Sequence, residues 1–353
     1  MGARLETRIG RTPLKNPLIA AAAEHMIDEE GARRAILAGA GAVVVKSTNE
    51  SEAAKDQLQR AEYLALDADW EPIPWGPDAP AHATLATRSG LSPLLFDAWL
   101  EQNLRLDRLA REQDCVLVAS LILAELDTAV LLARRVEEAG LRVLELNIGT
   151  PYAKEAAKGA VSTELSPERV GAIVATVRSA VSLPLWIKIT GQSERVPELA
   201  EAAFAAGADS VVMAGRLLGL IPSLDTLEPM LGTSLGIGGF WNLPLTCYWL
   251  ALTRRRLGKD RPLIGINGAK NGRDVARMML AGASAVGLAS AVMLRGFEVI
   301  SASLTELDAF LAAKSLTAAD LVGRAADRRK SFAEMELRRD HWRNFVPASP
   351  GGG

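Results

Sequence analysis

The sequence predicts a single α/β domain folded as a (β/α)8 barrel, or TIM barrel. Three observations predict it: short apolar segments recur along the chain, helical stretches separate most of them, and a glycine-containing junction repeatedly links helix to strand. The strand candidates are residues 18–22, 42–46, 115–121, 143–147, 185–189, 210–213, 263–266 and 285–289. Eight strands that alternate with helices favour a closed barrel over an open sheet. An open doubly wound sheet is the alternative, but no Gly-x-Gly-x-x-Gly motif follows the first strand.

The repeated junction explains why these segments are assigned to strands. It occurs at residues 35–45, 136–144, 203–212 and 279–288. In each, a glycine can end the helix in the left-handed conformation, and an apolar run follows. Runs that are apolar on both faces are typical of strands in a buried parallel sheet. We expect the helices at residues 28–38, 127–138, 167–180 and 272–281.

Two long insertions and a tail complete the predicted organisation. Residues 49–101 and 215–243 exceed ordinary loop length, and such insertions in a barrel usually lie at its C-terminal face, where they shape the substrate site. Residues 317–344 predict a charged helical tail. We therefore expect a cofactor-binding barrel over 1–312, a C-terminal helical extension over 313–346 and a flexible tail over 347–353.

Composition excludes several classes of protein. The chain has 353 residues and a formal net charge of −2. It therefore lacks the excess of basic residues that is typical of proteins that bind nucleic acid. Its two cysteines and three scattered histidines predict no disulfide framework, iron–sulfur cluster or metal site. No apolar run reaches membrane-spanning length and the N-terminus has no apolar signal core. We therefore expect a cytoplasmic protein that binds neither nucleic acid nor membrane.

Polar residues at the ends of predicted strands indicate a functional site. Lys46, Asn147, Lys188 and Asn267 each follow an apolar run, and barrel enzymes place their chemistry at these strand ends. A buried lysine needs a partner, and an ion pair is one way to provide it. Two lysines at equivalent ends, beside an asparagine, favour one shared anionic ligand instead.

Glycine-containing turns after the last two strands predict where a phosphate binds. Residues 267–272 open a helix after the seventh strand, and residues 287–291 follow the eighth. Barrels frequently bind phosphate at these two loops through backbone amides. A glycine turn alone is weak evidence, because entry into a helix also requires one.

Taken in order, these motifs resemble the dihydroorotate dehydrogenase family. The similarity runs from about residue 8 to about residue 300. The segments that carry it are NPLIAAAA at 16–23, GAGAVVVKST at 39–48, ELNIGTP at 145–151, PLWIK at 184–188, the pair Gly238 and Gly239, IGINGAKNGRD at 264–274 and AGASAV at 281–286. Each motif is loose by itself, and their order and spacing are specific.

The resemblance implies a bound FMN whose flavin carries the hydride chemistry. Lys188 would face the pyrimidine edge of the flavin, and Lys46 and Asn147 would lie beside ring and substrate as catalytic residues. The cofactor-binding residues that it implies are Ala22, Lys46, Ser47, Asn147, Lys188, Gly238, Gly239, Asn267, Gly268, Ala289 and Ser290. It also implies a small-molecule substrate, a separate electron donor or acceptor and a homodimer.

The chain departs from the family at the catalytic acid–base position. Thr150 stands where the family has cysteine or serine, and Gly149 replaces the serine before it. A threonine hydroxyl is a much weaker acid than a thiol, so it would need a water or a charge to relay protons. The alternative is that Thr150 merely forms a hydrogen bond with the backbone.

The substrate-binding residues differ further. Asn147 is retained, but Thr87, Tyr152 and Gly215 replace the other asparagines that surround a pyrimidine in the family. A site that lacks these paired donors and acceptors binds such a ring far less well, so we do not expect orotate as the substrate. Tyr152 and Trp241 indicate a flatter, more apolar or aromatic substrate, and Arg216 is a candidate anion contact.

The leading hypothesis is an FMN-dependent oxidoreductase that transfers a hydride at a C–C bond conjugated with a carbonyl or imide. A genuine dihydroorotate or dihydropyrimidine dehydrogenase is one alternative. The segment NIGTP at 147–151 also resembles tRNA-dihydrouridine synthases, although the cysteine of that family is missing. A catalytically silent flavin-binding protein is the remaining alternative.

Overall fold

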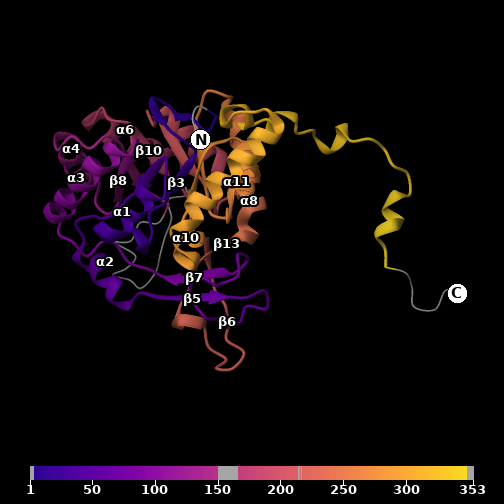
Figure 1. Ribbon diagram of the computed structural model, residues 1–353, viewed down its shortest axis with the longest axis horizontal. Coiled ribbons are helices and arrows are strands. Elements are labelled where there is room, and N and C mark those ends of the chain that lie inside the picture. Colours follow the sequence, from indigo (N-terminus) through magenta and orange to yellow (C-terminus); the bar gives the residue numbers. More distant parts are fainter. Residues whose placement is uncertain (1–3, 150–165, 214, 216, 348–353) are drawn as a thin grey trace.

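A closed barrel of eight parallel strands forms the centre of the molecule (Figure 1). The computed structural model describes residues 4–149, 166–213, 215 and 217–347. Strands that follow one another in the barrel pair in parallel, and the last pairs with the first to close it. The strands are β3 (Leu18–Ala20), β4 (Ala42–Val44), β8 (Val116–Ile122), β9 (Leu144–Asn147), β10 (Leu185–Lys188), β11 (Ser210–Met213), β14 (Leu263–Ile266) and β15 (Ala283–Leu288). All eight predicted strands are confirmed.

Helices surround this barrel and pack on its outer face. They are α1 (Glu29–Leu37), α3 (Phe96–Glu112), α4 (Leu126–Glu138), α6 (Pro167–Ala180), α7 (Val196–Ala205), α8 (Leu243–Leu257), α9 (Gly272–Leu280), α10 (Ser290–Arg295) and α11 (Glu298–Lys314). Side-chain caps begin several of them: Asp28 accepts from Gly31 N, and Asn271 accepts from Asp274 N. None of the helices in the described ranges is both long and apolar enough to cross a membrane.

The repeated glycine junctions have the predicted conformation. Their φ angles lie in the left-handed region that favours glycine: 97° at Gly39, 85° at Gly140, 101° at Gly207 and 126° at Gly282. The apolar runs that follow alternate between the two sides of the sheet. On β4, Ala42 and Val44 pack inside the barrel, whereas Val43 packs against the helices. The junctions therefore explain why the chain turns from each helix into a strand that is buried on both faces.

An N-terminal hairpin closes one end of the barrel. The strands β1 (Thr7–Ile9) and β2 (Thr12–Leu14) pair in antiparallel fashion and insert Ile9 and Leu14 into the cluster of side chains that fills the interior. Trp186 of β10 is fully buried in the same cluster. The hairpin covers the N-terminal ends of the parallel strands. The C-terminal ends, where barrel enzymes have their active sites, are at the opposite end of the barrel.

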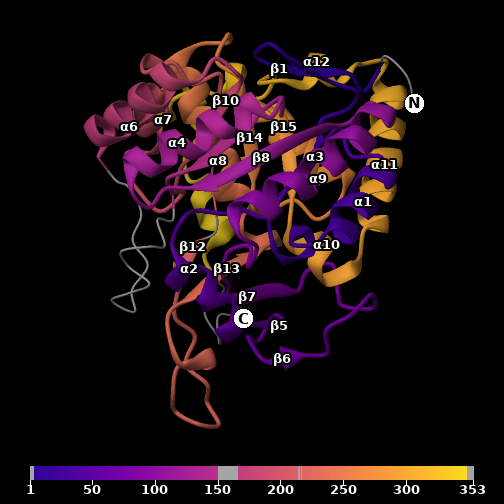
Figure 2. The same cartoon turned by 90° about the vertical axis from the view of Figure 1, so that its left-hand side faces the viewer.

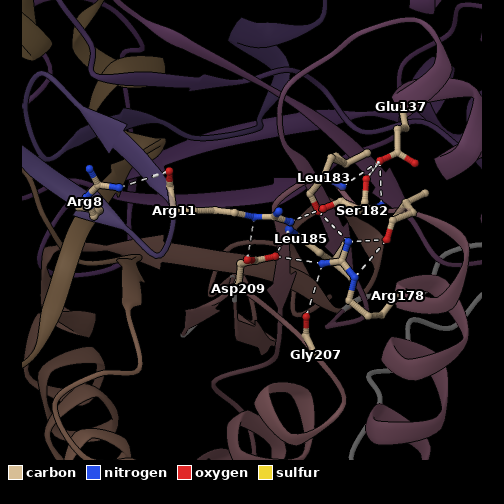
Figure 3. Close-up of polar contacts among 10 residues, drawn as sticks. Arg8, Arg11, Glu137, Arg178, Ser182, Leu183, Leu185, Gly207 and Asp209 are labelled. Carbon is tan, nitrogen blue, oxygen red and sulfur yellow. Dashed lines mark hydrogen bonds and ion pairs between the residues drawn. The ribbon is translucent and has the colours of Figure 1, made fainter.

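Arginines and carboxylates fasten the closed end of the barrel (Figure 3). Asp209 Oδ1 lies 3.2 Å from Arg11 Nε, and its Oδ2 accepts hydrogen bonds from Arg178 Nη1 at 3.0 Å and from Leu185 N at 2.9 Å. Arg178 also donates to the carbonyls of Val181 and Leu183. These contacts bind the hairpin, α6 and β10 to one another.

The two long insertions combine into a second sheet at the other end of the barrel. Its strand order is β12-β13-β7-β5-β6, and every pair is antiparallel. The strands are β5 (Glu62–Leu66), β6 (Pro72–Ile73), β7 (Thr84–Arg88), β12 (Leu217–Gly219) and β13 (Leu235–Gly239). Figure 2 shows this sheet at the opposite end of the molecule from β1. The sequence predicted the insertions but not the sheet that they form together.

The predicted helical tail contains only short helical segments and no continuous helix. It contains α12 (Ala318–Leu321), followed by the one-turn segments η5 (Ala326–Arg328), η6 (Phe332–Glu334) and η7 (His341–Phe345). Phe332 is 97% exposed and Leu337 is 91% exposed, and the segment runs away from the barrel in Figure 1. Because a short helix is marginal in water unless an apolar face packs on something, this segment does not form one continuous helix.

Candidate functional site

A cavity opens at the C-terminal ends of the barrel strands and beneath the second sheet. Its empty volume is about 1130 Å³, including the part that is open to solvent. Of the residues that the sequence predicted to bind the cofactor, all except Gly239 line it: Ala22, Lys46, Ser47, Asn147, Lys188, Gly238, Asn267, Gly268, Ala289 and Ser290. The structure therefore brings together residues that are more than 260 positions apart, since Ala22 and Ser290 share one cavity.

Lys46 lies in the cavity wall and is paired with a glutamate. Its Nζ donates to Glu24 Oε1 at 2.6 Å, and the two side chains are 9% and 16% exposed. The Lys46 backbone is held on both sides, since its N–H donates to Met26 O at 3.0 Å and its carbonyl accepts from Trp99 Nε1 at 3.0 Å. The lysine is therefore buried, oriented and neutralised by a partner in the same wall.

Glu24 is a site residue that sequence reasoning missed. It begins η1 (Glu24–Met26), directly after the run of alanines that follows β3, and it lines the cavity. A lone carboxylate at the end of an apolar segment was a usable signal, because the lysine at the end of the neighbouring strand needed a partner.

Lys188 ends β10 and belongs to a buried chain of polar groups. Its Nζ lies 3.8 Å from Glu145 Oε1, which accepts a hydrogen bond from Ser120 Oγ at 3.0 Å. Ser120 Oγ and Ser47 Oγ are 2.8 Å apart. Since the single hydroxyl proton of Ser120 goes to the carboxylate, Ser47 must be the donor to Ser120. The network joins the ends of four adjacent strands and fixes the position of the ammonium group.

The backbone beside Asn147 explains one departure from the family pattern. Asn147 Oδ1 accepts a hydrogen bond from Gly149 N at 3.0 Å, which orients its Nδ2 group as a donor. A Cβ atom on Gly149 would lie 2.9 Å from both Ile189 C and Thr190 N. Serine at this position would therefore collide with the backbone that directly follows β10, and glycine fits.

The loop after β14 forms a tightly packed backbone cradle. Asn267 and Gly268 have φ angles of 69° and 122°, and a Cβ on Gly268 would lie 2.5 Å from Leu243 N. Asn267 Oδ1 accepts from Gly239 N at 3.3 Å, and its Nδ2 donates to Gly215 O at 3.4 Å. Gly239 does not line the cavity, but its backbone N–H holds the Asn267 side chain in place. A glycine-containing loop that opens a helix, such as this loop after β14, is suited to binding a phosphate through its backbone amides.

The predicted substrate residues have different outcomes. Thr87 of β7 lines the cavity, and its Oγ1 donates to Gly236 O at 3.1 Å. Thr150, Tyr152 and Arg216 lie outside the described residues. Trp241 packs with the apolar side chains of the second sheet and is not among the residues that line the cavity.

Neither cysteine provides a nucleophile or acid for this cavity. Burial raises the pKa of Cys115 to about 12 and that of Cys247 to about 11. Neither residue lines the cavity. Burial also lowers the pKa of His25, next to Glu24, to about 4, so this imidazole is neutral at physiological pH. The charged groups that line the cavity from the described residues are Glu24, Lys46 and Lys188.

Comparison with known proteins agrees with this geometry. The family model described as dihydroorotate dehydrogenase matches residues 83–311, which is more than half of the chain. The protein named dihydroorotate dehydrogenase B (NAD(+)), catalytic subunit, from Methanocaldococcus jannaschii is 29% identical over 194 residues, or 52% of this chain and 58% of the relative. The protein of the same name from Saccharolobus solfataricus is 31% identical over 184 residues, or 52% of this chain and 60% of the relative.

A third relative covers more of the molecule. Dihydroorotate dehydrogenase A (fumarate) of Lacticaseibacillus paracasei is 27% identical over 282 residues, which is 79% of this chain and 88% of the relative. The chain spans less than two thirds of the length of the two archaeal relatives. The family match, the closed barrel and the ordered motifs nevertheless agree, and the chain belongs to the dihydroorotate dehydrogenase family.

Proposed function

We propose that the protein is an FMN-dependent oxidoreductase that transfers a hydride at a C–C bond conjugated with a carbonyl or imide of a small molecule. One observation carries the proposal: two lysines from different strand ends, the buried Lys46 and the largely buried Lys188, line one cavity with the glycine loop at 267–269. The names of the relatives, which are dihydroorotate dehydrogenases, support oxidation and reduction at such a bond.

The residues present fit FMN. The cavity combines the ammonium group of Lys188 with the backbone cradle at Asn267 and Gly268, which are the two kinds of contact that a flavin ring and its phosphate need. Lys188 would hold the pyrimidine edge of the flavin, and Gly268 and Ser290 would surround the phosphate, with Gly239 acting through Asn267. FMN, when bound, supplies the hydride chemistry.

The other polar residues of the cavity would position the substrate. Asn147 presents Nδ2 as a donor because its Oδ1 is held by Gly149 N. The ammonium group of Lys46, held by Glu24, would lie beside the flavin ring and the substrate and orient the reacting bond. Thr150 would hold or release the proton at the substrate carbon opposite the flavin.

Loading the purified protein with FMN tests the function. We expect one FMN per chain, with flavin absorbance that survives gel filtration. The loaded protein should then be reduced anaerobically by at least one compound from a panel of saturated lactams, imides and ketones. A colourless protein that no excess of FMN converts to a flavoprotein would contradict the proposal.

Orotate and dihydroorotate are not the substrates that we propose, because the pyrimidine-binding asparagines are replaced at Thr87 and Gly215, which line the cavity. The names of the relatives make dihydroorotate the second candidate. Anaerobic mixing of the loaded protein with dihydroorotate separates the two: we expect the flavin absorbance to persist, and its rapid bleaching would favour the second candidate.

We also propose a separate electron donor or acceptor, a cytoplasmic location and a homodimer. The relatives differ in the acceptor that their names give, NAD(+) in one group and fumarate in the other. Reoxidation of the reduced protein by each of these two compounds tests the acceptor. Light scattering of the purified chain tests the dimer, which should have twice the chain mass of 37.6 kDa.

A further inference from the structure

The pairing of charges in the cavity wall limits what the substrate can carry. Lys46 Nζ lies 2.6 Å from Glu24 Oε1, and Lys188 Nζ lies 3.8 Å from Glu145 Oε1. Glu24, Lys46 and Lys188 are the charged residues that line the cavity from the described ranges. Each ammonium group therefore already has a carboxylate beside it, and Glu24 lines the same cavity that the substrate would enter.

The pair is buried, so its charges are poorly screened. The exposed fractions of Lys46 and Glu24 are 9% and 16%. Charges interact more strongly in such surroundings than in water, and like charges placed side by side are disfavoured. A substrate carboxylate beside Lys46 would lie close to the Glu24 carboxylate as well. The attraction of the lysine for an anion is therefore largely cancelled by its partner.

The rest of the adjoining wall also suits an uncharged molecule. Leu91, Ile122 and Ala21 are buried apolar residues that line the cavity. Among them, a carboxylate acts as an acceptor that favours an N–H or O–H donor on the ligand. Neutral lactams and imides carry such a donor next to the carbonyl group.

We propose that Glu24 is a specificity-determining residue, which selects neutral substrates that offer an N–H or O–H donor and rejects those that carry a carboxylate near Lys46. This inference rests on the proposed function and narrows its substrate class. It assigns to Glu24 a role in recognition and in holding Lys46 in place, without a covalent or redox step.

Uracil and orotate form a suitable probe pair, because they share one ring and differ by a carboxylate. FMN stoichiometry is measured first, on wild type, Glu24→Gln and a control, Glu29→Gln. Glu29 forms a comparable ion pair with Arg105 at 2.9 Å on the exposed surface. Each loaded protein is then titrated with both probes, and binding is followed by the flavin absorbance difference and by calorimetry.

We expect Glu24→Gln to bind orotate at least about tenfold more tightly than wild type, whereas its affinity for uracil does not rise. Glu29→Gln should behave as wild type. Glu24→Asp, which keeps the charge, should keep the rejection of orotate. If Glu24→Gln does not fold, Glu24→Ala, which also removes the charge, should show the same gain of orotate binding.

Two results would overturn the inference: wild type that binds orotate as tightly as Glu24→Gln, or loss of orotate rejection in Glu24→Asp. If the wild-type protein takes up no FMN, the proposed function itself is contradicted. Normal FMN loading with unchanged discrimination between the probes would sink the role of Glu24 alone.

Discussion

The two ends of the barrel use ion pairs in opposite ways. At the closed end, Asp209 binds Arg11 and Arg178, and the apolar side chains of the β1–β2 hairpin fill the interior. At the open end, Lys46 and Lys188 also have carboxylate partners, but they line a cavity of about 1130 Å³. Ion pairs therefore stabilise the closed end of the barrel, whereas ion pairs at the open end line the cavity that a ligand would enter.

If this comparison holds, changes at the open end should affect ligand binding, and changes at the closed end should affect stability alone.

The largest effect is expected from Gly268→Ala in the backbone cradle. Its φ is 122°, and the new Cβ would lie 2.5 Å from Leu243 N, so both strain and collision result. We expect a loss of about 3 kcal/mol or more in the free energy of unfolding, together with loss of FMN binding. Urea unfolding and FMN titration measure the two effects.

Gly258→Ala is the matched control for this change. Gly258 has a φ of 84°, but no atom lies within 4 Å of the Cβ position, so the variant keeps the strain and removes the collision. It should lose about 1 kcal/mol and bind FMN normally. Equal effects of the two substitutions would contradict the close packing of the cradle.

Asp209→Asn should destabilise the closed end and leave the cavity intact. The substitution weakens contacts with Arg11, Arg178 and the backbone N–H of Leu185. We expect unfolding to require about 1–3 kcal/mol less free energy, with an unchanged dissociation constant for FMN. A clear change in FMN affinity would show that the two ends are coupled.

A smaller, pH-dependent effect is expected at Glu137, in the same network. Partial burial acts to raise the pKa of this carboxyl, but hydrogen bonds from Ser182 and Leu183 outweigh it and lower the pKa below 4.5. Because the folded pKa is lowered, the carboxylate stabilises the fold above the unfolded pKa, and this contribution is lost as the pH falls through the folded value.

Glu137→Gln should therefore reduce the loss of stability on acidification below about pH 4.5, by no more than about 1 kcal/mol, because solvent screens the group. Parallel urea titrations at neutral and acidic pH compare the variant with wild type. A steeper acid dependence in Glu137→Gln would have the wrong sign.

Removing the tail after residue 328 should have the smallest effect. Phe332 and Leu337 are almost fully exposed, and Ser331 forms its hydrogen bonds with Glu334 inside the tail. We expect a change within about 0.5 kcal/mol and unchanged FMN binding. A larger loss of stability would show that the tail packs on this chain or on a second copy.

Much of the barrel could be predicted because its signals are local. Strands that are buried on both faces appear in the sequence as apolar runs. The glycine junctions, such as the one at Gly39, indicate where a helix ends and a strand follows. Lys46 and Lys188 stood out because a charge at the end of such a run is costly without a partner. Strand ends of one parallel barrel meet at one face, so these residues were expected to lie together.

The remaining features depend on contacts between distant segments. Strands β7 and β13 pair across about 150 residues, for example at Thr87 and Gly236, and no local pattern specifies that register. The Glu24 partner of Lys46 was missed for the same reason, since it lies in η1, the turn that follows the preceding barrel strand β3. The tail was overpredicted as helix because its charge pattern gave no information about whether it packs on the barrel.

The decisive measurement is the affinity of Lys188→Met for FMN, since we propose that a largely buried ammonium group is held in the cavity wall for a flavin. Lys188 is 14% exposed, whereas Lys259, 75% exposed and 3.6 Å from Asp327, provides the control Lys259→Met. We expect Lys188→Met to bind FMN about 10- to 100-fold more weakly than wild type, with a lowered flavin reduction potential. Lys259→Met should equal wild type, and FMN binding by Lys188→Met that is as tight as in wild type would contradict the proposal.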